Sequence, residues 1–99
     1  MNRPPRPERP DRPKAPEPPS APAPELRIDA LGRKCPIPII LLAERIGEVP
    51  VGGVVEVLAD DPAAKTDMPA WCGLKLHAFL GVAELGDVAG WAFWIRRSY

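Results

Sequence analysis

The spacing of hydrophobic and polar positions changes several times after residue 24, and each change predicts an element of the fold. Residues 25–31 alternate between apolar and polar side chains, which is typical of a half-buried strand. Residues 38–48 place apolar side chains three and four positions apart, as on one buried helix face, and these are Ile39, Leu42, Ala43 and Ile46. The other elements predicted in this way are a β-branched strand at 54–59, a helix at 63–77, strands at 79–85 and 91–96, and a hairpin loop at 86–90.

The order strand, helix, strand, helix, strand, strand predicts an α/β (α+β) two-layer sandwich. Each strand–helix–strand crossover is expected to be right-handed, so both helices pack on the same face of a four-stranded mixed sheet. The other face is then left to solvent or to a partner. Residues 92–95 are more apolar than one face requires, so we expect partial burial on both sides.

A proline inside the second helical segment complicates its prediction. Pro69 removes one backbone hydrogen bond and clashes with the preceding turn, at a cost of about 3 kcal/mol. We therefore expect either a new helix start with Asp67 as its N-cap or a kink at Met68. Asp61, directly before Pro62, is the expected N-cap of the first turn. The side chains expected to face inwards are Trp71, Leu74 and Ala78.

Composition separates the first 24 residues from the rest of the chain. They hold ten of the fifteen prolines, with arginines at regular spacing, and no aromatic or branched aliphatic side chain. Such a segment buries too little to offset the entropy of ordering. We predict a disordered Pro/Arg-rich leader at 1–24 and one domain at 25–99. The leader is either a solvated, semi-stiff tail or a docking segment for a proline-recognising partner.

Charge and cysteine content exclude several classes of protein. The formal net charge is zero, with +2 in the leader and −2 in the remainder, so a direct nucleic-acid interface is not expected. No apolar run reaches the roughly 18 residues of a membrane span, and the N-terminus lacks the apolar stretch of a secretory signal. Two cysteines are too few for a disulfide framework or a structural metal site. We expect a cytoplasmic protein with free thiols and no metal.

The candidate chemistry lies directly before the first helix. Gly32 ends the strand, and the motif continues with Arg33, Lys34, Cys35, Pro36 and Pro38. Proline is tolerated in the first helical turn, so the two prolines place the helix start at or just after Cys35. The helix N–H groups and macrodipole would then face the sulfur, and the two cations add to the field. Such surroundings lower a cysteine pKa from about 8.5 to between about 3.5 and 7.5. The sequence therefore predicts a reachable thiolate at neutral pH.

The other candidate residues each have a structural and a functional interpretation. Cys72 is expected in the core, with a resolving thiol for Cys35 as the alternative. His77 is expected to interact with a helix C-terminus, with a catalytic part as the alternative. The acids Asp60, Asp61 and Asp67 are caps and turn formers, or they orient a partner. Packing is expected for the tryptophans Trp71, Trp91 and Trp94 rather than base stacking.

These motifs together resemble one family of proteins. Cys-Pro-x-Pro at a helix start, after a strand and a glycine, is similar to the signature of the TusA/SirA sulfur carriers. The turn at 60–62 is similar to the family's aspartate–proline turn, and residues 67–72 are similar to its Asp-x-Pro-x-aromatic-Cys stretch. His77 falls where family members often carry a histidine. The resemblance covers roughly residues 26–97 and leaves the leader outside.

The resemblance implies a sulfur relay. Cys35 would accept a sulfane sulfur as a persulfide and pass it on, and Pro36 and Pro38 would fix its geometry; no cofactor is implied beyond that covalent persulfide. The implied partners are a sulfur donor, such as a cysteine desulfurase or rhodanese, and an acceptor protein. The family serves tRNA thiolation, molybdenum-cofactor sulfuration, sulfur oxidation and selenium metabolism. Ile37 stands where well-known carriers have an acid, which we expect to change partner recognition more than thiol chemistry.

Two other functions stay open on the sequence. A thiol redox or regulatory module would need Cys35 and Cys72 with Cα atoms within about 7 Å. A non-catalytic interaction domain would use the leader for binding and bury Cys35. An exposed Cys35 sulfur favours the sulfur carrier, which would relay a persulfide rather than act alone as a multiple-turnover enzyme.

Overall fold

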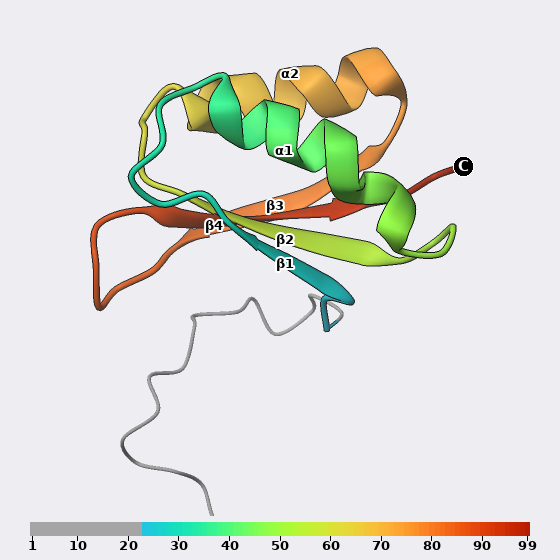
Figure 1. Ribbon diagram of the computed structural model, residues 1–99, viewed down its shortest axis with the longest axis horizontal. Coiled ribbons are helices and arrows are strands. Elements are labelled where there is room, and N and C mark those ends of the chain that lie inside the picture. Colours follow the sequence, from blue (N-terminus) through green and yellow to red (C-terminus); the bar gives the residue numbers. More distant parts are fainter. Residues whose placement is uncertain (1–22) are drawn as a thin grey trace, which may run out of the picture.

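The computed structural model describes residues 23–99, so the predicted leader lies outside it apart from its last two residues. The described chain forms two layers, a sheet and a pair of helices (Figure 1). In chain order the elements are β1 (Leu26–Asp29), α1 (Ile37–Arg45), a 3₁₀ turn (Ile46–Glu48), β2 (Val54–Ala59), α2 (Ala64–Lys75), β3 (Ala78–Glu84) and β4 (Trp91–Arg96). This order confirms the predicted fold class.

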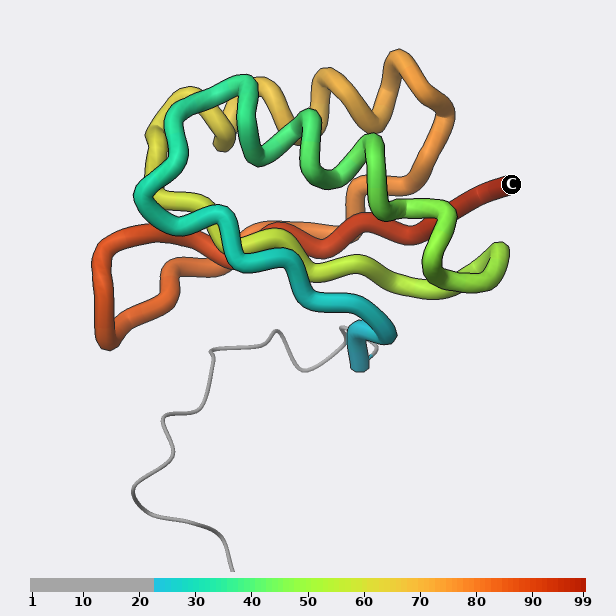
Figure 2. The backbone as a smooth tube through the Cα atoms, in the orientation of Figure 1, coloured from blue at the N-terminus to red at the C-terminus, as the bar shows by residue number. Residues whose placement is uncertain are grey.

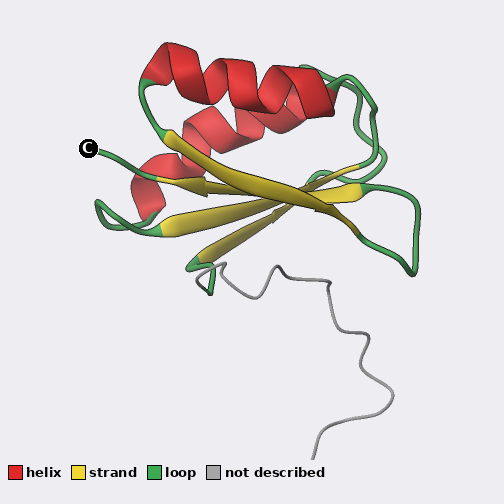
Figure 3. Cartoon of the chain, turned by 180° about the vertical axis from the view of Figure 1, so that it is seen from behind, coloured by secondary structure: helices red, strands yellow, loops and turns green. Residues whose placement is uncertain are grey.

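The four strands form one mixed sheet in the order β1-β2-β4-β3. β1 pairs with β2 in parallel, and β4 is antiparallel to both of its neighbours. The crossover through α2 therefore carries the chain from β2 past the position of β4 to the far edge of the sheet. Both helices lie on the same face of the sheet, as predicted (Figure 3).

The helix α1 begins where the two prolines place it. Pro36 is its N-cap, and Pro38 lies in the first turn. Pro38, Leu42 and Ile46 are buried at four-residue spacing, while Ala43 is exposed, so its predicted place in the core is wrong. Pro38 thus fills a core position, although its backbone has no N–H to donate within the helix.

The helix α2 differs from its prediction in continuity and in orientation. It is a single helix with Pro69 inside, so neither the new start at Asp67 nor that residue's role as N-cap is correct. Asp61 lies two residues before the cap, where its Oδ1 accepts a hydrogen bond from Ala63 N at 3.0 Å. The N–H that Pro69 lacks would have bonded to the carbonyl of Lys65, a solvent-exposed residue.

The buried face of α2 consists of Ala64, Met68 and Cys72. Leu74, predicted to face inwards, is 75% exposed, because two residues after Cys72 a helix has turned by more than half a revolution. Ala78, also expected inside, is half-buried at the start of β3.

The sheet carries buried side chains on both faces. The helix-covered core includes Ile28, Val55, Val57, Phe93 and Ile95. A second cluster on the other face includes Val54, Ala92 and Trp94. The predicted burial of residues 92–95 on both sides is thus confirmed and is nearly complete.

A buried carboxylate also lies on the helix-free face of the sheet. Glu56 is 0% exposed. It pairs with the guanidinium of Arg27 on β1 and accepts a hydrogen bond from Trp94 Nε1 on β4 at 3.1 Å. These three residues lie opposite one another on adjacent strands. The central carboxylate is therefore partnered on both sides.

The connections that matter for function gather at one end of the sandwich. Figure 2 shows the loop before α1, the turn before α2 and the β3–β4 hairpin at the same end, with the C-terminus at the other. The hairpin packs closely there: a Cβ atom on Gly90 would lie 3.0 Å from the Ala59 carbonyl oxygen. The fold thus brings two segments that are distant in sequence, the turn before α2 and the hairpin, to the end of the sandwich that carries the thiol motif.

Candidate functional site

The segment that carries Cys35 is held against the β2–α2 turn by two neighbouring aspartates. Asp60 Oδ2 accepts a hydrogen bond from Gly32 N at 2.9 Å, and Asp61 Oδ2 accepts one from Cys35 N, also at 2.9 Å. Before them, Ala30 N donates to the Leu58 carbonyl at 2.8 Å and extends the β1–β2 pairing. Asp60 and Asp61, which the sequence presents as turn formers, therefore fix both ends of the stretch that holds Arg33 and Lys34.

Cys35 lies at the entrance to α1 and is half-buried. It is one of several partly buried residues that pack against the helix-covered core. The sulfur-bearing residue is thus neither sealed in the core nor freely solvated. A partner has to approach closely to reach it.

The backbone of residues 35–38 has no free N–H donor, contrary to the prediction that such donors face the sulfur. Pro36 and Pro38 have no N–H, Ile37 N donates to the Lys34 carbonyl at 2.8 Å, and Cys35 N donates to Asp61. Across residues 35–38 of the described chain, no backbone N–H is left for the sulfur. The prolines that position the helix also remove two of the donors that an anion site at a helix start uses.

The predicted thiolate is also wrong. Partial burial raises the pKa of the Cys35 thiol above its usual value, and the nearby carboxylates of Asp67 and Asp61 raise it further. Of the two carboxylates, Asp67 has the larger effect, because a negative charge near the sulfur favours its protonated form. Cys35 is therefore a thiol at neutral pH, and the two adjacent cations do not reverse this.

The two carboxylates near the sulfur differ in their own bonding. Asp61 accepts backbone hydrogen bonds from Cys35 N and Ala63 N, and these lower the pKa of its carboxyl group, with a smaller contribution from Lys34. Asp67 is an exposed residue in the first turn of α2. Asp61 thus anchors the backbone of Cys35, whereas Asp67 acts on the pKa of its thiol.

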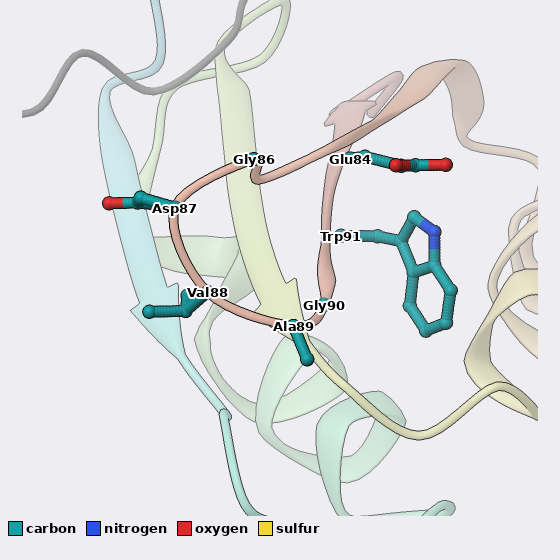
Figure 4. Close-up of a pocket in the computed structure, with 7 residues that line it drawn as sticks. All are labelled: Glu84, Gly86, Asp87, Val88, Ala89, Gly90 and Trp91. Carbon is teal, nitrogen blue, oxygen red and sulfur yellow. The ribbon is translucent and has the colours of Figure 1, made fainter.

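Two hollows lie near this end of the molecule. A small one of about 130 Å³ is lined by Gly32, Arg33, Lys34, Asp60, Asp61 and Pro62. A larger, open one of about 490 Å³ lies at the β3–β4 hairpin, where Glu84 and Trp91 point to one side and Asp87 and Val88 to the other (Figure 4). Lys65 Nζ lies 5.0 Å from the centre of the Trp91 ring. The sequence predicts the hairpin but gives no sign of this hollow.

Cys72 is a core residue, as predicted. It is 1% exposed, and burial raises the pKa of its thiol to about 11. A thiol so buried and so weakly acidic is a poor nucleophile and a poor resolving partner.

His77 lies beyond the far end of α2 from Cys35. The helix has twelve residues and is therefore about 18 Å long. The imidazole stacks between Trp71 and Tyr99, with ring centroids at 5.7 and 4.7 Å, and its Nδ1 accepts a hydrogen bond from Ser98 N at 3.0 Å. Partial burial, together with Arg97, lowers the pKa of His77. It lies at the C-terminus of α2, as predicted, where its backbone N–H donates to the Cys72 carbonyl at 3.0 Å, and it takes no part in the thiol site.

Residues 23–99 contain no cluster of three or more histidine, cysteine or acidic side chains arranged to hold a metal ion. None of the helices in that range combines the length and the apolar character that crossing a membrane requires.

The structure defines a small α+β domain with a half-buried thiol at a proline-marked helix start. A family model described as sulfurtransferase TusA matches residues 26–97. The chain is 33% identical over 74 residues to the sulfur carrier protein TusA of Pseudomonas syringae pv. syringae, covering 75% of this chain and 86% of that protein. It is 36% identical over 71 residues to its counterpart in Pseudomonas entomophila, covering 72% and 86%.

A solved structure agrees with this assignment. The SirA-like protein of Desulfitobacterium hafniense superposes with a TM-score of 0.64 at 28% identity, covering 75% of this chain and 99% of that one. The chain belongs to the TusA family, which confirms the resemblance seen in the sequence. Membership supports a role in sulfur relay among partner proteins.

Proposed function

We propose that Cys35 accepts a sulfane sulfur as a persulfide and passes it to an acceptor protein. The observation that carries this proposal is a reachable thiol at the start of α1, held by Asp61 in a member of a sulfur-carrier family. In the loading step the Cys35 sulfur attacks the outer sulfur of a donor persulfide. A new S–S bond forms, the donor's S–S bond breaks, and the donor cysteine leaves as a thiolate that takes up the proton lost by Cys35.

The partners follow from this chemistry. The donor is a protein that presents a persulfide, of the cysteine desulfurase or rhodanese type, and the acceptor carries a group that attacks the outer sulfur of the Cys35 persulfide. The covalent persulfide is the only cofactor required. The acceptor pathway is tRNA thiolation, molybdenum-cofactor sulfuration or sulfur oxidation, with the chain acting as a relay and not on nucleic acid itself.

The surface around the thiol suits a protein partner. Ile37 and Ile40 on α1 are 38% and 44% exposed and lie just after Cys35, while Arg33 and Lys34 are exposed just before it. A partner that reaches the sulfur must cover this mixed apolar and cationic surface. The apolar Ile37 in place of an acid therefore changes what the partner meets.

The redox alternative finds less support. It requires Cys72 to form a reversible disulfide with Cys35, but the Cys72 thiol is buried and has a pKa of about 11. A purely structural role for Cys35 is disfavoured by its partial exposure and by the backbone clamp that positions it.

Intact-mass spectrometry after incubation with a cysteine desulfurase and cysteine tests the proposal. We expect the wild type and Cys72→Ser to gain one sulfur atom and Cys35→Ser to gain none. A parallel incubation with a rhodanese and thiosulfate tests the second donor type. Gain of sulfur by Cys35→Ser, or by no variant with either donor, would contradict the proposal.

A further inference from the structure

The helix-free face of the sheet is apolar at its centre, although no helix or strand of the described chain lies over it (Figure 3). Val54, Ala92 and Trp94 on this face are 2%, 0% and 1% exposed. Partly buried apolar side chains pack against them, and these are Leu31, Leu58, Leu80 and Ala83. A sheet face that meets water alternates towards polar side chains, whereas contiguous apolar surface marks an interaction site. The composition of this face therefore indicates that a further segment packs on it.

The described chain begins on this same side of the sheet. It bends at Glu25, and the blue start of the chain, residues 23–25, lies on the side of the sheet that faces away from the helices (Figures 1 and 2). From there β1 runs towards the end of the sandwich that carries the β3–β4 hairpin. The path from Glu25 to Leu31 is about 20 Å at the rise of a strand, and about seven residues span it as a polyproline II helix. The leader segment before that span, residues 9–15, is therefore within reach of the hairpin.

Exposed carboxylates lie at the hairpin end of this face. Asp29 ends β1 and Asp87 lies in the hairpin loop, and both are exposed. Asp29 projects from the same face as Arg27, because side chains two positions apart in a strand share a face. The cations of this face are engaged or distant, since Arg27 pairs with the buried Glu56 and Arg96 ends β4 at the opposite end of the sheet. The hairpin end of the face therefore suits a cationic ligand.

The leader carries the matching chemistry. Residues 9–14 read Arg-Pro-Asp-Arg-Pro-Lys, with three cations against one acid. Proline rings pack on apolar surface at little entropic cost, because a polyproline II chain is already ordered locally, and guanidinium groups pair with carboxylates. The hairpin offers both kinds of surface, since its open hollow of about 490 Å³ places Val88 and Ala89 beside Asp87 (Figure 4).

We propose that residues 9–14 dock on the helix-free face at the β3–β4 hairpin of the same chain, with their cationic side chains at Asp29 and Asp87. Exposed ion pairs are individually weak and are screened by salt. The tether compensates for this weakness, because a short flexible linker gives an effective concentration on the order of 1 mM. A contact with a Kd of about 1 mM is then formed about half of the time.

The docked segment lies next to the loop that carries the thiol. The hairpin borders that loop, since a Cβ atom on Gly90 would lie 3.2 Å from Leu31 Cδ2 and 3.3 Å from Asp60 Cβ. A protein that approaches Cys35 from the hairpin side therefore meets the leader as well as the domain.

Paramagnetic relaxation in the full chain tests the proposal. A nitroxide label is attached through Ala15→Cys in a Cys35→Ser background, where Cys72 stays unlabelled because it is buried. At about 0.05 M salt we expect the label to reduce the amide signals of residues 85–90 by about half, and at about 0.5 M salt the loss should shrink at least about threefold. A tail that does not dock would instead affect most strongly the residues nearest its attachment, 25–27 and 50–54.

Charge reversal supplies the matched control. Asp87→Lys should abolish most of the signal loss at residues 85–90, because it places a cation where the leader's cations dock. Glu44→Lys makes the same change of charge at an exposed position on α1, in the other layer, and should leave the loss intact. Circular dichroism verifies the fold of each variant.

Three results would overturn the proposal. The first is a signal loss that is strongest at residues 25–27 and 50–54. The second is a loss at residues 85–90 that Asp87→Lys leaves unchanged, or that Glu44→Lys removes equally. The third is an equal loss when the nitroxide and the isotope label are on different chains in a mixture, which would show contact between two copies.

Discussion

The two cysteines should differ sharply in reactivity, and the structure gives the size of that difference. Cys72 has a pKa of about 11, so at pH 7 only about one molecule in ten thousand carries its thiolate. It is also 1% exposed, so a reagent reaches it only when the domain opens. With an unfolding free energy of about 5 kcal/mol or more, reaction through the open state is at least about 10³-fold slower than in the unfolded chain. Cys35 is limited by its protonation but needs no opening.

We therefore expect iodoacetamide at pH 7 to modify Cys35 at least about 100-fold faster than Cys72. Tryptic peptides separate the two sites, because cleavage after Lys34 and Arg45 isolates Cys35, and cleavage after Lys65 and Lys75 isolates Cys72. Modification at both sites is followed by mass spectrometry over time. In urea above the unfolding midpoint, the rates should converge to within a few-fold, which controls for intrinsic reactivity. Native rates within tenfold of each other would refute the description of both sites.

Three further predictions concern the fold. Arg27→Ala should destabilise the protein by about 3 kcal/mol in urea unfolding, because it leaves the buried Glu56 carboxylate with the Trp94 indole as its remaining side-chain partner; a change below 1 kcal/mol would contradict this. Met68→Ala should cost about 2–5 kcal/mol as a core truncation, whereas exposed Leu74→Ala should change stability by less than about 0.5 kcal/mol; similar costs for both would mean that α2 is rotated differently. Folding lowers the pKa of His77, so the unfolded chain binds this proton more readily than the folded chain does. The free energy of unfolding is therefore highest above about pH 6.5 and decreases as the pH falls towards the pKa of His77 in the folded protein. In His77→Phe, the thermal midpoint should change less between pH 5 and 7 than it does in the wild type. An unchanged pH dependence of the midpoint would disprove the lowered pKa of His77.

The sequence predicts the architecture well because its signals are local. The β-branched run of β2 and the prolines before α1 limit the backbone locally, and the glycines of the hairpin permit the positive φ angles that its turn uses. The wrong predictions concern residues whose burial depends on contacts between elements that are distant in the sequence. Pro38 is buried where Ala43 was predicted to be, and Cys72 is buried while Leu74 is not. The rotation of a short helix about its axis depends on the sheet against which it packs.

The site shows the same division between local and distant causes. Cys35 and its proline frame are visible in the sequence, and the surrounding cations argue for a thiolate. The causes that decide its protonation are partial burial and the carboxylates of Asp67 and Asp61, 32 and 26 positions away, and all of them arise only in the folded chain. A sequence argument based on flanking charges therefore gave the wrong sign for the shift of its pKa.

The measurement that tests the central claim most directly is the location of the transferred sulfur. The wild-type protein is loaded with a cysteine desulfurase and cysteine, alkylated without reductant, digested with trypsin and analysed by mass spectrometry. The account predicts one added sulfur on the peptide that begins at Cys35, and loss of that sulfur when a thiol acceptor is added before alkylation. Added sulfur on the Cys72 peptide, or a Cys35 sulfur that no acceptor removes, would contradict a relay through Cys35.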